Sequence, residues 1–103
     1  MDQILEFNCR SRVGKTYACI ASHCADPATG VRSIRIAVAD QGIGIGSLQF
    51  VFSAQFQATF PGCWSDLILV AQKRFVKESW IEQILKHPGQ DLQNPFEDFS
   101  GSD

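Results

Sequence analysis

The sequence predicts an α+β domain: about five antiparallel strands in meander order, open or barrel-like, with a C-terminal helix packed on one face. Two observations lead to this prediction. Several segments alternate apolar and polar residues between turn residues, as strands with one buried face do. Near the C-terminus the apolar spacing becomes helical. With 103 residues, 45% of them hydrophobic and 19% charged, the chain is expected to form a single domain over residues 1–89.

The first two strands are predicted on either side of a short turn. Residues 4–10 (ILEFNCR) place Leu5, Phe7 and Cys9 on one face and polar residues on the other. Residues 11–15 (SRVGK) supply the turn, and residues 15–24 (KTYACIASHC) are interpreted as the second strand. The Asp-Pro step in residues 25–30 (ADPATG) indicates a loop.

The next two strands show the clearest alternation in the sequence. In residues 31–40 one face is formed by Ile34, Ile36 and Val38. In residues 47–56 one face is formed by Leu48, Phe50, Phe52, Ala54 and Phe56. An antiparallel sheet with one solvated face produces this pattern. Residues 57–66 are expected to be a loop.

The region after this loop contains the predicted helix. Residues 67–71 (LILVA) are apolar at every position, so residues 67–75 are interpreted as a buried fifth strand, with a helix as the alternative. Ser79 and Glu82 have the spacing of a capping box and predict a helix that ends at residues 87–89 (HPG). Trp80 is expected to meet the phenylalanine face of the fourth strand in the core.

Residues 90–103 are predicted to form an acidic tail that is loose or docked on a neighbour. The segment has turn residues and no periodicity, and it carries four acidic residues and no Lys or Arg. Phe96 and Phe99 stand among these acids (NPFEDF). Short acidic and aromatic peptides of this kind dock into grooves, so both residues are candidates for binding a partner.

The segment IRIAVADQGIGIG, residues 34–46, is the most motif-like in the chain. Its part DQGIGI resembles the first glycine box, D-x-G-x-G-I, of the histidine-kinase-like ATPases (the GHKL superfamily). The segments LQFVFSAQF and QKRFV are also similar to parts of those proteins. The resemblance implies that Asp40 would read the adenine amino group, and that Gly42 and Gly44 would let the backbone approach the nucleotide.

The same residues also fit a structural interpretation, which we favour. The sequence has no second glycine box, and strands are predicted where the family has a helix that carries a magnesium-binding Asn. Gly42, Gly44 and Gly46 alternate with isoleucines in the period of a strand. Such a segment bends a sheet or lets a helix approach closely. A reduced nucleotide binder that uses Asp40 and residues 42–46 is the alternative.

The other motifs predict no chemistry. The GKT of RVGKTY lacks the first glycine of a phosphate-binding loop, since that position is Cys9. The spacing of Cys19, His23 and Cys24, with Cys9 as a fourth ligand, fits no known zinc pattern, and the cysteines are expected to be free thiols. Two histidines without an orienting residue do not indicate catalysis. We therefore predict no catalytic residue, metal or cofactor.

Charge and hydropathy limit the partners. A net charge of −2 and no dense basic patch argue against nucleic acid. No apolar run is long enough for a membrane span, and the N-terminus has no secretory pattern, so a cytoplasmic protein is expected. We predict a small binding or interaction module that forms a homodimer, because the edge of a sheet needs covering. A pocket between sheet and helix, rimmed by Arg35, Gln49 and Gln55, is the expected ligand site.

Overall fold

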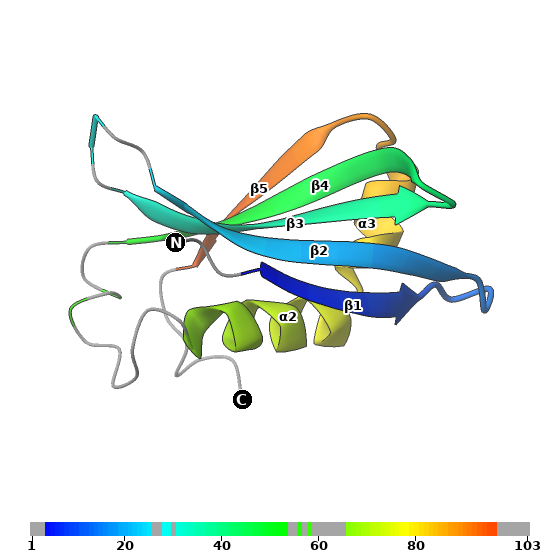
Figure 1. Cartoon of the computed structure of the whole chain (residues 1–103), viewed down its shortest axis with the longest axis horizontal. Coiled ribbons are helices and arrows are strands. Elements are labelled where there is room, and N and C mark those ends of the chain that lie inside the picture. Colours follow the sequence, from blue (N-terminus) through cyan, green and yellow to red (C-terminus); the bar gives the residue numbers. More distant parts are fainter. Residues whose placement is uncertain are drawn as a thin grey trace.

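A computed structural model describes residues 4–25, 28–29, 31–53, 56, 58 and 66–96 (Figure 1). Four antiparallel strands follow one another as a meander: β1 (Ile4–Arg10), β2 (Thr16–Ala25), β3 (Arg32–Asp40) and β4 (Ile43–Phe52). Helices α2 (Leu67–Lys77) and α3 (Trp80–Lys86) lead to β5 (Asp91–Phe96), which pairs with β4 in parallel. The α+β fold with a five-stranded sheet is confirmed; the sheet is mixed and does not close into a barrel.

The strand expected over residues 67–75 is wrong, because this segment is the first part of α2. The buried residues of α2 have helical spacing, namely Leu67, Ile68, Ala71 and Phe75, whereas Leu69 and Val76 are 49% and 50% exposed. In residues 67–71 five apolar residues follow one another, although not all of them are buried. The helical spacing of the buried ones therefore cannot be recognised from the sequence. The fifth strand is instead β5, which lies in the segment that was expected to be a tail.

The core lies between the helices and one face of the sheet (Figure 1). The predicted inward faces are confirmed for β3 and for β4 as far as Phe52, since Ile34, Ile36, Val38, Leu48, Phe50 and Phe52 are almost completely buried. Strand β4 ends at Phe52, so Phe56 is buried but lies beyond the strand, and Ala54 lies outside the described residues. The rings of Phe7 and Phe75 meet edge to face, with centroids 6.0 Å apart. Phe50 meets Trp80 in the same way at 6.3 Å. The predicted contact of Trp80 is therefore present, but Trp80 lies at the margin of the core.

Helix α3 forms where it was expected, but the capping box does not. Ser79 has a left-handed backbone (φ 56°, ψ 40°), and its side chain makes no cap hydrogen bond. The short connection from α2 requires this conformation, in which the Ser79 N–H donates to the carbonyl of Val76. The carboxylate of Glu82 is engaged elsewhere, since it accepts a hydrogen bond of 2.6 Å from the backbone N–H of Arg12.

The hairpin between β3 and β4 is tighter than the sequence suggested. Its turn consists of Gln41 and Gly42, which both have positive φ, 51° and 84°. Two central residues with positive φ are typical of the two-residue hairpin turn that matches strand twist. Strand β4 therefore begins at Ile43 rather than at Ser47, and the glycine segment belongs to the sheet.

None of the described helices has both the length and the apolar content needed to cross a bilayer.

Phe75→Ala is expected to lower the free energy of unfolding by roughly 3–5 kcal/mol, because it empties a fully buried site under Phe7. Val76→Ala, one residue along the same helix but half-exposed, is the matched control and should change stability by no more than about 0.5 kcal/mol. Urea denaturation of both variants tests this. Equal losses in the two variants would contradict the packing of α2 described here.

Candidate functional site

The structure places Asp40 in an ion pair at the end of β3. Its carboxylate lies 2.6 Å from the ammonium of Lys15, which also sits over the ring of Tyr17 at 5.4 Å. The hydrogen bond from Lys15 to Asp40 and the charge of Asp40 raise the pKa of Lys15. The ion pair ties the start of β2 to the end of β3. The carboxylate proposed to read adenine is thus already paired with a cation.

The glycine segment forms a β-bulge at which the chain after α3 is attached. Val38 pairs with Gly46 and Ala39 pairs with Gly44, so Ile45 is an extra residue in β4. The carbonyl of Ile45 accepts a hydrogen bond of 2.8 Å from the N–H of Gly89. The N–H of Ser47 donates to the carbonyl of Gln90 at 3.2 Å. These two bonds hold the connection between α3 and β5 against the bulge.

Gly46 has a packing role that Gly44 does not share. A Cβ atom at position 46 would lie 2.8 Å from Cγ2 of Ile84 and 3.4 Å from the carbonyl oxygen of Gln90. At position 44 a Cβ atom would meet no other atom within 4 Å. The glycine segment therefore bends β4 and admits α3 at close range, as the structural interpretation expects. In the described part of the chain, β2 and not a helix precedes β3.

Arg35 and Gln49 are neighbours in register, but they lie on the face of the sheet away from the helices, which we call the open face. Their expected position between sheet and helix is wrong. The Arg35 guanidinium lies 3.5 Å from the carboxylate of Asp91. Gln49 donates a hydrogen bond of 2.7 Å to the Ser33 hydroxyl and lines a pocket of about 370 Å³ on this face.

Asp91 is held by Ser47 as well as by Arg35. The Ser47 hydroxyl donates to the Asp91 carboxylate and is the main reason that the pKa of Asp91 is lowered, with the charge of Arg35 as a further cause.

Of the other predicted site residues, Gln55 and Phe99 lie outside the described residues. Phe96 is the last residue of β5. The structure thus brings Arg35 and Gln49 together. Gly44 and Gly46 lie apart from them, near the start of β4.

Arg35, on the middle strand β3, is the charged residue at the centre of the open face. The outward residues of β2 are Thr16, Ala18, Ile20, Ser22 and Cys24, and β3 adds Ser33, Ala37 and Ala39 around Arg35. The other outward charges belong to the edge strands, Glu6 and Arg10 in β1 and Asp91 in β5. Ile4 and Ile20, diagonal neighbours on β1 and β2, are 63% and 45% exposed.

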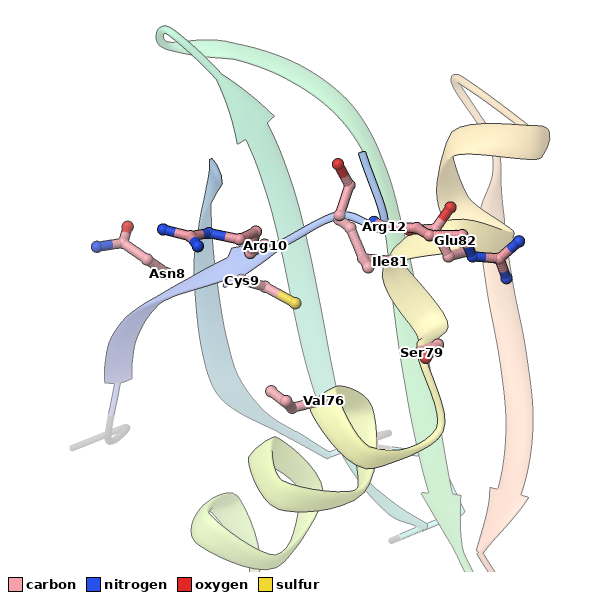
Figure 2. Close-up of a pocket in the computed structure, with 9 residues that line it drawn as sticks. Asn8, Cys9, Arg10, Arg12, Val76, Ser79, Ile81 and Glu82 are labelled. Atoms are coloured by element: carbon pink, nitrogen blue, oxygen red, sulfur yellow. The ribbon is translucent and has the colours of Figure 1, made fainter. Parts of the chain in front are cut away.

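A pocket of about 340 Å³ lies beside β1, where the strand meets the junction of α2 and α3 (Figure 2). It is lined by Asn8, Cys9, Arg10, Ser11, Arg12, Val76, Ser79, Ile81 and Glu82. Figure 2 shows the Cys9 sulfur directed into the space between the strand and the helices. Sequence reasoning missed this pocket because its two walls are about 70 residues apart in the chain, as the bond between Arg12 and Glu82 shows.

The thiols are suited to packing rather than to nucleophilic chemistry. Burial raises the pKa of Cys9, with a smaller contribution from the Glu82 carboxylate, and burial raises the pKa of Cys19 to about 12. Both thiols are therefore protonated at neutral pH. Cys9, Cys19 and Cys24 are free. Within the described ranges, no three His, Cys, Asp or Glu side chains are placed to hold a metal ion.

Gly46→Ala is expected to lower the free energy of unfolding by about 1–3 kcal/mol, because the β-branched, buried Ile84 cannot move aside without strain. Gly44→Ala is the matched control and should be neutral or stabilising by up to about 1 kcal/mol. Thermal and urea denaturation measure both. Equal stability of the two variants would disprove the close packing of α3 on Gly46.

Ser47→Ala is expected to raise the pKa of Asp91 toward the ordinary aspartate value, because the main hydrogen bond to the ionised carboxylate is lost. In the wild type the lowered pKa contributes stability above the unfolded-state pKa, and this contribution disappears as the pH falls through the folded-state pKa. Carboxyl ¹³C NMR against pH measures the shift. Ser33→Ala, which removes the bond to Gln49 instead, should leave the Asp91 titration unchanged.

Comparison with protein-family models, with curated proteins and with solved structures finds no match to this chain. Its function is therefore inferred from its own surfaces.

Proposed function

We propose that the chain is a small protein-interaction module that forms a homodimer through the β1 side of its sheet. The observation that supports this is the uncovered corner formed by the edge strand β1 and the open face of β2. Among the described residues only β2 pairs with β1, so the outer edge of β1 keeps unpaired backbone groups. Such an edge favours pairing with another strand.

The corner combines exposed apolar side chains with charges that a second copy can pair. On the open face, Ile20 and Ala18 are exposed, and Ile4 is a diagonal neighbour of Ile20. Glu6 and Arg10 lie on the edge strand beside them. Large exposed aliphatic side chains beside an uncovered edge favour a protein partner over a small polar ligand.

The charges on the open face favour a second copy of the same chain as the partner. The described strands direct two acidic residues, Glu6 and Asp91, and two basic residues, Arg10 and Arg35, outward on this face. The face is therefore electrically neutral and does not repel its own copy. Closed two-fold dimers are the most common assembly of soluble chains.

The free thiols support a reducing compartment such as the cytoplasm as the place of action. Cys9 and Cys19 are buried, Cys24 is half-buried, and none of the three forms a disulfide. Free thiols persist where glutathione and thioredoxin keep cysteines reduced.

The dimer is tested by the mass of the native protein. Sedimentation equilibrium over a range of concentrations should give a mass approaching twice the 11.4 kDa of one chain as the concentration rises. The expected dimer dissociates on dilution into a folded monomer, because the described core residues are buried within a single chain. A mass of a single chain at every concentration would overturn the proposal.

A further inference from the structure

We infer that β1 of a second copy pairs antiparallel with β1 around a two-fold axis through Asn8, which joins the two five-stranded sheets into one. This inference rests on the proposed homodimer and specifies its interface. It depends on the row of β1 residues on the open face, Ile4, Glu6, Asn8 and Arg10, which all lie at the exposed edge. In this row a carboxylate and a guanidinium are equally distant from Asn8.

Symmetry leaves few registers for such a pair. Residues that are opposite each other in an antiparallel ladder lie on the same face, so the two-fold axis must pass through a residue. An axis through Glu6 would place two carboxylates against each other, and an axis through Arg10 would oppose two guanidinium groups. Like charges directly opposite each other destabilise a sheet.

Only the axis through Asn8 pairs Glu6 of each copy with Arg10 of the other. An axis through Phe7 would oppose Glu6 to Asn8 and leave Arg10 opposite Ile4, without an ion pair. Opposite charges at facing positions stabilise a ladder, and the two-fold axis produces this pair twice. The charges of β1 therefore favour the register in which the two-fold axis passes through Asn8.

The buried side of β1 agrees with this register. Phe7 and Cys9 lie on that side, and in the proposed ladder Phe7 of each copy is opposite Cys9 of the other. Cys9 borders the pocket beside β1, which extends from Asn8 to the junction of α2 and α3 (Figure 2). Phe7 is only partly buried within its own chain. The ladder would cover this ring and the mouth of the pocket together.

The same two charges also explain why the edge does not pair indiscriminately. Charged side chains on an edge strand oppose association with unrelated strands. A partner is accepted only when it presents the opposite charges at the matching spacing. Strand β1 of a second copy meets this condition.

A charge exchange tests the register. Glu6→Arg and Arg10→Glu should each weaken the dimer roughly tenfold or more, because each change replaces two attractive pairs by two repulsive ones. The double variant Glu6→Arg/Arg10→Glu restores both pairs with their signs exchanged and should dimerise within a few-fold of the wild type. Sedimentation equilibrium gives the dissociation constants, and circular dichroism checks that each variant remains folded.

Ile43→Lys is the matched control, because Ile43 is 70% exposed but belongs to β4, which is not adjacent to β1. It should leave the dissociation constant of an edge-paired dimer unchanged. Ile20→Lys instead probes the open face, on which Ile20 is exposed. If Ile20→Lys abolishes the dimer while the two charge variants leave it intact, the copies associate face to face. That result would overturn this inference while leaving the proposed homodimer standing. A wild-type protein that is always monomeric would overturn both.

Asn8→Cys gives a second and independent readout. With the axis through Asn8, the two substituted positions face each other directly, at a Cα separation of about 4.5–5.5 Å that a disulfide can span. Mild oxidation should therefore produce a covalent dimer that reducing agent separates. Adding Glu6→Arg should suppress this cross-link. If Asn8→Cys does not cross-link although the protein is dimeric, the register is different and the inference is overturned.

Discussion

Where α3 crosses β4, the side chain of Ile84 occupies the space that a side chain at position 46 would need. This close approach depends on a glycine, and the β-bulge beside it turns the backbone of Ile45 toward the chain that follows α3. The hydrogen bonds from Gly89 to Ile45 and from Ser47 to Gln90 then direct that chain alongside β4. This contact and these two hydrogen bonds place the parallel strand β5 beside β4, where its six residues pair with the strand.

The sheet that results has two unlike faces. One is buried under α2 and α3 and is made of aromatic and branched aliphatic side chains. The other carries small or uncharged residues on β2 and β3 around Arg35, which pairs with Asp91 of the edge strand β5. Lys15 and Asp40 form another pair at the hairpin end. Because the described helices cover only one face, the open face of the sheet is left available for association.

The sequence predicted the fold best where local pattern and burial agree. The faces of β1, β3 and β4 could be read from alternation because each of these strands has one buried side. Helix α2 could not, since Leu69 and Val76 are apolar but exposed and hide the helical period. Strand β5 is six residues long and contains Pro95, so its position depends on β4 and not on its own pattern.

The candidate surfaces were less predictable than the fold. The sequence predicted that the glycine segment would let a helix approach or bend the sheet. It could not identify Ile84 as the residue that packs on Gly46, because the two residues are far apart in the chain. Arg35 and Gln49 were correctly placed on neighbouring strands and assigned to the wrong side, because alternation separates two faces without telling which one the helices cover. The pocket beside β1 requires the strand order, the α2–α3 junction and the bond between Arg12 and Glu82 to be known together.

The position of β5 also affects how the chain can fold during synthesis. The first four strands pair with sequence neighbours, whereas β5 joins the sheet only after both helices have been synthesised. Until those residues emerge, β4 is an edge, and the side chain of Leu92 is missing from the border of the core. A ribosome that stalls before residue 91 would hold a meander with two open edges, the kind of intermediate that chaperones bind.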